Sequence, residues 1–217
     1  GRSESQETCP DTATRTGPRG RTEVTAVHSS HLVLGGARSG KSRHALEQAA
    51  QPGGRVAFLA TARARDGDMA ARIARHRAER PAGWTTLEEP QDVAAACRRA
   101  APAHDLVVVD CATVWVANLM ERGDDDAAVL AAVDDLAKLM RERLLSVIVV
   151  SNEVGAGVHP PTELGRRFRD LLGLVNQRLA AAADRVTLMV AGLPLTVPKT
   201  ATDTPLPPAH DPPPEAP

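Results

Sequence analysis

The feature that most constrains this chain is the glycine-rich segment GGARSGKS at residues 35–42. It directly follows the apolar segment His31–Leu34 and precedes the helical pattern SRHALEQAA. Glycines let a backbone turn tightly and bring its N–H groups against an anion, and the start of a helix adds the positive end of its dipole. Lys41 supplies a point charge for the β- and γ-phosphates, and Ser42 supplies a hydroxyl for Mg²⁺. The segment therefore predicts a phosphate-binding loop for a nucleoside triphosphate.

Short apolar segments alternate with longer helical patterns over the middle of the chain. Five segments are rich in Val, Leu and Ile and are apolar on both faces, as buried parallel strands are: His31–Leu34, Arg55–Ala60, Asp105–Asp110, Leu145–Ser151 and Arg185–Ala191. Helical patterns lie at 41–51, 67–80, 91–101, 113–121, 126–143 and 162–183. This alternation predicts an α/β fold similar to that of P-loop NTPases, with a mainly parallel central sheet and helices on both faces.

The two ends of the chain differ from this middle. Residues 1–30 are rich in Thr, Ser, Gly and Arg without a helical or strand period, and residues 198–217 are rich in proline. Neither end can bury enough apolar surface to offset the entropy lost on ordering. We therefore expect a disordered N-terminal extension at 1–30, one domain at 31–197 and a Pro-rich disordered tail at 198–217.

The composition excludes several classes of protein. Lys and Arg number 26 against 27 Asp and Glu, so the net charge is −1, and aromatic residues make up 2% of the chain. A chain without a strong positive field or stacking aromatics is not expected to bind nucleic acid. The cysteines have no paired spacing, which favours a reducing cytoplasm. No apolar run approaches the roughly 18 residues of a membrane span.

A carboxylate follows the central segment DLVVVD at Asp110. In phosphate-loop sites, an aspartate at the end of such a strand meets Mg²⁺ directly or through water. The other interpretation is that Asp110 caps the helix that starts near Ala112. With the phosphate loop present, we favour the metal role and predict Ser42 and Asp110 as ligands.

A positively charged segment follows the second strand. From Arg63 to Arg80 there are six Arg against three acids, and His76 shares a helical face with Met69 and Ile73. A neutral imidazole is a competent nucleophile, and neighbouring arginines can hold a triphosphate. The other interpretation is a surface Arg cluster with a packed His, which spacing alone favours.

Three motifs together decide between these interpretations: the phosphate loop, R-I-x-x-H-x-x-x-R-P-x-x-W and N-E-V-G-x-G. They lie in four blocks that follow one another between residues 32 and 197, at 34–46, 58–90, 107–120 and 151–195. The chain resembles the bifunctional adenosylcobinamide kinase / adenosylcobinamide-phosphate guanylyltransferase family of cobalamin biosynthesis. The combination of motifs is far more specific than any one of them.

The resemblance implies two reactions. A nucleoside triphosphate, ATP or GTP, phosphorylates adenosylcobinamide, and GTP then guanylylates an enzyme histidine, which passes GMP to adenosylcobinamide phosphate to give adenosylcobinamide-GDP. His76 matches that histidine, and Lys41 is the second expected catalytic residue. The expected nucleotide contacts are Gly35, Gly36, Ala37, Arg38, Ser39, Gly40, Lys41, Ser42, Ala60, Thr61, Ala62, Arg77, Ala78, Glu79, Arg80, Glu88 and Asp110. The resemblance also suggests a homo-oligomer, specifically a trimer.

Some features keep two interpretations open. The resemblance implies that the 152–157 loop and its following helix lie near the site or at a subunit contact. The other interpretation is a turn and an amphipathic helix with solvated charges. Thr113 and Asn118 suit a site, a helix cap or a helix filler equally. His159 and Thr162 depart from the family pattern. Two alternative functions are a P-loop small-molecule kinase without guanylyl transfer and a nucleotide-dependent regulatory switch.

Overall fold

The computed structural model describes residues 28–50, 54–63 and 80–199, together with Gly67, Ala74, Arg77 and Ala78. A seven-stranded sheet runs through these residues in the order β3-β2-β4-β5-β1-β6-β7. All neighbouring strands pair in parallel except β6 and β7, which are antiparallel. The strands are β1 Ser30–Gly35, β2 Val56–Ala60, β3 Thr85–Glu88, β4 Leu106–Asp110, β5 Ser146–Val150, β6 Arg185–Val190 and β7 Leu193–Val197.

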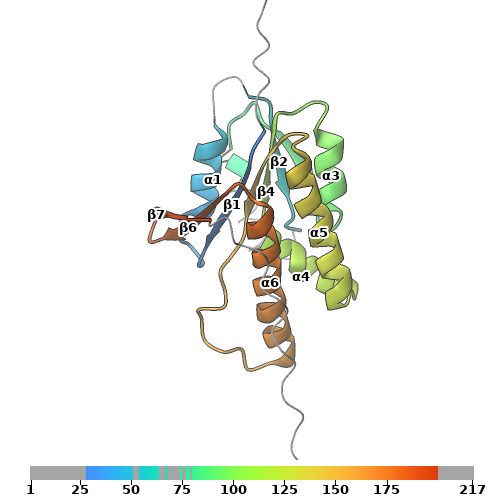
Figure 1. Cartoon of the computed structure of the whole chain (residues 1–217), viewed down its shortest axis with the longest axis vertical. Coiled ribbons are helices and arrows are strands. Elements are labelled where there is room, and N and C mark those ends of the chain that lie inside the picture. The colour runs from blue at the N-terminus through green and yellow to red at the C-terminus, as the bar shows by residue number, and fades with distance from the viewer. Residues whose placement is uncertain are drawn as a thin grey trace, which may run out of the picture.

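Helices cover both faces of the sheet. Figure 1 shows α1 on one side and α3, α5 and α6 on the other. The described helices are α1 Lys41–Ala49, α3 Val93–Ala100, α4 Ala112–Arg122, α5 Asp126–Glu142 and α6 Glu163–Ala182. None of these helices is long and apolar enough to cross a membrane.

The central strands are apolar on both faces because each face packs against its own layer. In β4, Val107 and Val109 belong to the larger core with α3, α4, α5 and α6, whereas Val108 belongs to the smaller core on the α1 side. Successive side chains of a strand point to opposite faces, so a run of valines fills both layers. The predicted α/β class, with a mainly parallel sheet between helices, is therefore confirmed.

Two strands are missing from the sequence prediction. β3 is four residues long and only half-buried, and every residue of β7 is exposed. β7 contains Pro194 and lies at the antiparallel edge of the sheet, where a missing N–H is tolerated. Ala191 and Gly192 form the turn between β6 and β7, with φ of 51° and 83°. Neither strand has the buried apolar pattern that predicted the other five.

Several predictions lie outside the described residues. These are most of the helix at 67–80, residues 1–27 of the predicted extension at 1–30, and residues 200–217 of the predicted tail at 198–217. The two disordered extensions therefore stay predictions. β1 itself begins at Ser30, which is buried.

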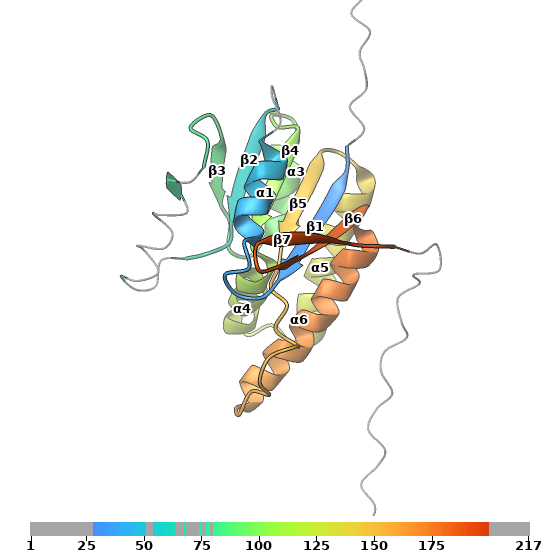
Figure 2. The ribbon, with the colours of Figure 1, turned by 90° about the vertical axis from the view of Figure 1, so that its left-hand side faces the viewer.

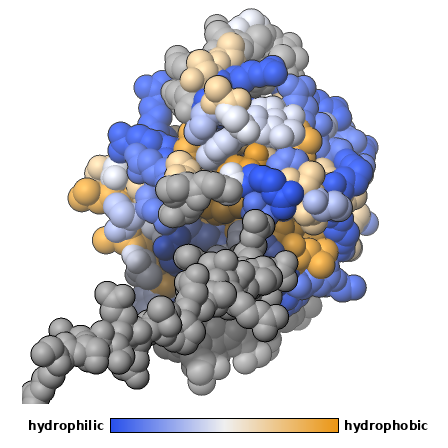
Figure 3. All heavy atoms as spheres, turned by 90° about the horizontal axis from the view of Figure 1, so that it is seen from above, coloured by the Kyte–Doolittle hydropathy of each residue, from blue (hydrophilic) through white to orange (hydrophobic). Residues whose placement is uncertain are grey.

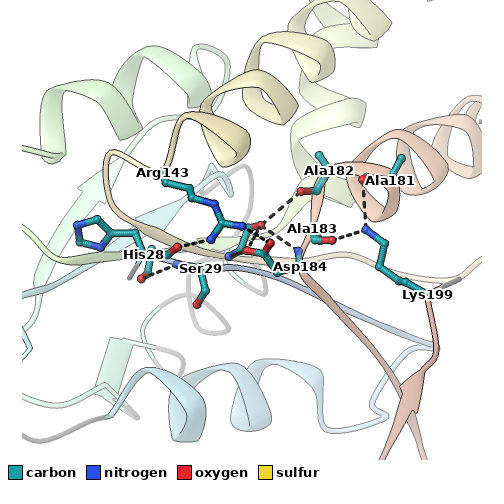
Figure 4. Close-up of polar contacts among 10 residues, drawn as sticks. His28, Ser29, Arg143, Ala181, Ala182, Ala183, Asp184 and Lys199 are labelled. Atoms are coloured by element: carbon teal, nitrogen blue, oxygen red, sulfur yellow. Dashed lines mark hydrogen bonds and ion pairs between the residues drawn. The ribbon is translucent and has the colours of Figure 1, made fainter. Parts of the chain in front are cut away.

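A polar cluster ties the amino ends of β1 and β6 to the end of α5 (Figure 4). Asp184 accepts hydrogen bonds from the Ser30 backbone at 2.8 Å and from Arg143 at 2.6 Å. Arg143 also donates to the His28 carbonyl, and Lys199 donates to the carbonyls of Ala181 and Ala183. Burial raises the pKa of Asp184, but hydrogen bonds from Ser30 and the charge of Arg143 outweigh it and hold that pKa below its usual range. The cluster fixes the end of the sheet opposite the phosphate loop.

Candidate functional site

The phosphate loop joins β1 to α1 through two glycines that no other residue could replace without strain. Gly35 has φ 151°, and a Cβ there would lie 2.5 Å from the Met189 carbonyl oxygen. Gly40 is the N-cap of α1, in the left-handed region with φ 93°. Such backbone angles are open to glycine and rarely to other residues. The loop therefore turns as tightly as its sequence predicted.

Two neighbouring segments hold this loop from outside. The Gly192 amide donates to the Ser39 carbonyl at 3.1 Å, and the Glu153 amide donates to the Gly35 carbonyl at 3.1 Å. Figure 2 shows the turn between β6 and β7 beside the loop that joins β1 to α1. The loop is therefore fixed by β6, β7 and the segment after β5 before any ligand binds.

Lys41 lies across the phosphate loop. Its Nζ donates to the Gly36 carbonyl at 2.5 Å and reaches Ser39 Oγ at 3.5 Å, and the residue is buried. These are bonds to neutral oxygens. A phosphate oxygen would make a stronger, charge-assisted bond with the same ammonium.

The parallel register brings distant residues into one row at the carboxyl edge of the sheet. Ala60 of β2 pairs with Glu88 of β3 on one side and with Asp110 of β4 on the other. Asp110 pairs in turn with Val150 of β5. This row ends beside β1, which carries the phosphate loop, so the strand ends and the loop share one edge.

Arg80 faces this row. Its guanidinium lies 3.6 Å from the centre of the Phe58 ring, and Nη1 donates to Thr86 Oγ1 at 3.2 Å. Nε is buried and has no hydrogen-bond partner among the described residues. Burial lowers the pKa of Arg80, the carboxylates of Asp110 and Glu88 raise it, and Arg77 lowers it further. Arg80 is thus a partly desolvated cation held against an aromatic ring.

These groups meet in a cavity of about 530 Å³. Four cationic residues and one acidic residue line it: Arg38, Lys41, Arg43 and Arg80, and Asp110. An excess of cations in a partly enclosed cavity attracts a polyanion. The complete lining is Ala37, Arg38, Ser39, Gly40, Lys41, Ser42, Arg43, Phe58, Ala60, Ala62, Arg80, Asp110, Cys111, Val114, Val150 and Asn152.

The structure brings most, but not all, of the predicted contacts together. Residues 37–42 line the cavity with Ala60, Ala62, Arg80 and Asp110. Six others are described but do not line it: Gly35, Gly36, Thr61, Arg77, Ala78 and Glu88. His76 and Glu79 lie outside the described residues.

Thr61 supports the site from behind. It is fully buried, its Oγ1 donates to the Cys111 carbonyl at 2.9 Å, and it accepts from the Cys111 amide at 2.9 Å. Asn118 of α4 donates to the carbonyls of Thr61 at 2.8 Å and Pro90 at 3.0 Å. These bonds connect the ends of β2 and β4 with α4. Asn118 therefore links two loops by hydrogen bonds and does more than fill space on its helix.

The alternative role of Asp110 as a helix cap is wrong. The N-cap of α4 is Cys111, and no side chain caps that helix. Asp110 is the last residue of β4 and lines the cavity. Beside it, burial and the Asp110 carboxylate raise the pKa of the Cys111 thiol to about 11. This thiol is protonated at neutral pH and is a poor nucleophile.

A family model described as cobinamide kinase / cobinamide phosphate guanyltransferase matches residues 31–197. The chain belongs to this family. The match spans the described sheet except Ser30, the first residue of β1, and it includes all the residues that line the cavity.

Three relatives of this guanyltransferase family are similar over nearly their full length. The bifunctional adenosylcobalamin biosynthesis protein CobP of Pseudomonas aeruginosa is 48% identical over 164 residues, which are 76% of this chain and 94% of the relative. The bifunctional adenosylcobalamin biosynthesis proteins CobU of Escherichia coli and Salmonella typhimurium are 40% and 41% identical over 174 residues, 75% of this chain and 96% of each relative. A solved KaiC-like protein from Pyrococcus horikoshii is 14% identical and superposes with a TM-score of 0.44 over 74% of this chain and 70% of that chain.

The side chains at this family site fit Mg²⁺ carried in by a nucleotide. Among the described residues, no group of three or more His, Cys, Asp and Glu side chains is arranged to hold a metal ion alone. Mg²⁺ usually keeps several waters and takes one or two protein oxygens plus substrate phosphates. Ser42 and Asp110 offer two such oxygens to the same cavity.

Asn152 is the cavity residue whose role the sequence left open. Its loop had two interpretations, near the site or a solvated turn, and the structure places Asn152 in the cavity lining. Arg43, Phe58 and Val114 also line the cavity, and no motif indicated them. Phe58 belongs to the apolar strand β2 and gave no signal beyond that of a core residue.

Proposed function

We propose that this chain phosphorylates adenosylcobinamide with a nucleoside triphosphate and then transfers GMP from GTP to adenosylcobinamide phosphate, giving adenosylcobinamide-GDP. The observation that carries the proposal is one cationic cavity with the phosphate loop, Asp110 and Arg80 in its lining. The chain also belongs to a family described by both a kinase and a guanyltransferase activity.

In the phosphorylation, the substrate hydroxyl attacks the γ-phosphorus. The bond to the bridging oxygen breaks, the nucleoside diphosphate leaves and the hydroxyl proton is released. The backbone amides of the loop and Lys41 hold the β- and γ-phosphates. When bound at Ser42 and Asp110, Mg²⁺ neutralises the charge that develops on these phosphates.

In the guanylyl transfer, His76 is the nucleophile. A neutral imidazole nitrogen attacks the α-phosphorus of GTP, and pyrophosphate leaves. A phosphate oxygen of adenosylcobinamide phosphate then attacks the same phosphorus and frees the histidine. The Cys111 thiol in the cavity lining is a poor competing nucleophile, because burial and the Asp110 carboxylate raise its pKa to about 11. Arg77, Glu79 and Glu88 complete the proposed nucleotide contacts.

The proposal includes a homo-oligomer, specifically a trimer, in the cytoplasm, where ATP and GTP are available. The edge of the sheet supports an assembly. Leu193 is 67% exposed and Leu195 53% exposed, and they lie on the edge strand β7, which pairs on one side with β6. Sedimentation equilibrium of the chain tests this part, and a monomer at micromolar concentration would contradict it.

Labelling with [α-³²P]GTP tests the covalent step. We expect an acid-labile, base-stable protein adduct in the wild type and none in His76→Ala. His104→Ala is the matched control, because His104 follows the turn at 101–103, its Nδ1 contacts the Ala100 carbonyl and it does not line the cavity. Label that persists in His76→Ala would refute the role of this histidine.

Separate assays of the two reactions test the shared nucleotide site. Lys41→Ala should lose both activities by about a hundredfold or more, because it removes the charge on the phosphates. Lys138→Ala on the surface of α5 is the matched control, since Lys138 is exposed, forms an ion pair with Glu142 and does not line the cavity. His76→Ala should retain phosphorylation. A folded His76→Ala protein that lost both activities equally would contradict separate roles.

A further inference from the structure

The strand order places the end of β5 between the two halves of the phosphate site. β5 lies between β1, which leads into the phosphate loop, and β4, which ends in Asp110. Val150 pairs with Val33 on one side and with Asp110 on the other. The residues that follow Val150 therefore leave the sheet between the loop that holds phosphates and the predicted metal ligand.

Asn152 is the polar side chain that this segment contributes to the cavity. It lines the same cavity as Lys41 and Asp110. Both hydrogen bonds of Asn152 to other side chains involve its backbone atoms. Its side-chain amide has no hydrogen-bond partner among the described residues. A carboxamide that lines a cationic cavity and is not used by the fold offers an N–H donor to a ligand.

The backbone of Asn152 is held on both sides. Its amide donates to Thr113 Oγ1 of α4 at 2.7 Å, and its carbonyl accepts from Asn176 Nδ2 of α6 at 3.0 Å. Ser151, which is fully buried, donates to Asn176 Oδ1 at 2.7 Å and bonds the Val33 carbonyl through its own amide at 3.0 Å. Two helices and β1 thus fix one short segment.

This polar network requires the burial of a side-chain amide, which does not favour folding. Asn176 is 6% exposed in the apolar core beneath α6, where burying an amide is unfavourable unless it is fully bonded. A leucine there would suit packing alone. Both groups of the Asn176 side chain instead bond the backbone or the side chain of residues 151–152, so the network serves to position that segment.

We propose that Asn152 hydrogen-bonds the terminal phosphate of the bound triphosphate through Nδ2, and that Thr113 and Asn176 are positioning residues for it. This inference rests on the nucleotide site of the proposed function. It adds a donor to the γ-phosphoryl group from the segment that follows β5. A diphosphate has no group at that position, so Asn152 makes the site distinguish triphosphates from diphosphates.

Binding measurements test this without relying on turnover. The probes are the β,γ-imido analogues of ATP and GTP and the corresponding diphosphates, each with Mg²⁺, titrated by calorimetry. We expect Asn152→Ala to weaken binding of the triphosphate analogue about tenfold, the effect of one lost bond to a charged acceptor. Diphosphate affinity should not change. Asn152→Asp should weaken the triphosphate analogue further, because a carboxylate repels the phosphate.

Variants of the two positioning residues test the network. Asn176→Leu should lower the ratio of triphosphate to diphosphate affinity while the protein stays folded, and Gln177→Leu, at the next and exposed position of α6, should not. Thr113→Val should lower the ratio and Thr113→Ser should restore it, because serine keeps the hydroxyl. A network that serves only the fold would change the melting temperature in these variants without changing the ratio, which would overturn the positioning role.

The outcomes separate this inference from the proposed function. Equal weakening of both nucleotides in Asn152→Ala, or no change in either, would overturn the contact to the terminal phosphate. The proposed function would survive that result if the wild type still phosphorylates adenosylcobinamide. A wild type that binds neither nucleotide would overturn both.

Discussion

Arg80 lies in surroundings that suit a guanidinium better than any other cationic side chain. It is a partly buried cation that faces the Phe58 ring, with a buried Nε that lacks a partner among the described residues. A planar guanidinium can stack on the ring and still direct donors to phosphate, whereas an ammonium cannot do both. We therefore expect Arg80→Lys, which keeps the charge, to weaken GTP binding about tenfold.

Fluorescence titration with a labelled GTP analogue measures this effect. Arg99→Lys is the control, since Arg99 is exposed and pairs with Glu89 outside the cavity. Full affinity in Arg80→Lys would mean that only the charge matters at this position.

The residue-level prediction succeeded where one short segment carries its own geometry. The tight turn at 35–42 could be predicted because it depends on the backbone angles of glycines within that same segment. The role of Asn152 could not be assigned, because its position is fixed by Thr113 and Asn176, which lie on two other elements. A sequence shows the amide but not the groups that hold it.

At the scale of elements, one hydroxyl extends the joint between β2 and β4 beyond their paired residues. Thr61 Oγ1 both donates to and accepts from the backbone of Cys111, and the residue is fully buried. Thr61→Val keeps the shape but leaves the Cys111 amide unsatisfied, whereas the Cys111 carbonyl keeps its hydrogen bond from the Trp115 amide at 3.1 Å. We expect the free energy of unfolding to fall by about 1–3 kcal/mol.

Urea denaturation measures that loss, and Thr61→Ser is the matched variant because it keeps the hydroxyl. Stability should return in the serine variant apart from the lost methyl group. If valine and serine had equal effects, the hydroxyl would not be what holds the joint.

Strands could be predicted where burial on both faces requires a continuous run of apolar residues. The five central strands were found because their apolar runs fill two layers, as β5 does. β3 and β7 were missed because an edge strand pairs on one side and needs no such run. β7 forms through its backbone pairing with β6 and the turn at Ala191 and Gly192, and neither produces a hydrophobic period.

At the scale of the whole molecule, one buried histidine should make stability depend on pH. His31 of β1 is 4% exposed and lies 2.8 Å from Thr187 Oγ1, while Arg185 of β6 donates to its Nδ1 at 3.0 Å. An Nδ1 that accepts from Arg185 requires the neutral ring. Burial, together with the charges of Arg185 and His44, lowers the pKa of His31 to about 4.

Because the unfolded chain has a histidine pKa near about 6.5, it binds the proton first as the pH falls. The free energy of unfolding should therefore decrease from about pH 6.5 to about pH 4, by about 2–3 kcal/mol in total. Denaturation at several pH values measures this slope. His31→Gln should remove most of it, and a slope unchanged in that variant would assign the dependence to other groups.

The arrangement of the whole sheet was predicted only as a class. Alternation of strands and helices indicates a parallel sheet, but it does not give the order in which β1 lies beside β5 and β6. That order decides which loops meet, so the cavity lining could not be derived from the chain alone. The family resemblance supplied the expected contacts of Ala60, Ala62 and Arg80 without supplying the reason they meet.

The same strand order has a consequence for biosynthesis. β1 leaves the ribosome early, yet both of its partners in the sheet come much later, and the contact from Ser29 to Ser146 spans 117 residues. At translation rates of about 5–20 residues per second, the glycine-rich loop waits for several seconds or longer without flanking strands. The contacts that hold the loop from Glu153 and Gly192 form only after β5 and β6 have been synthesised. We therefore expect the phosphate loop to take its final shape late in synthesis.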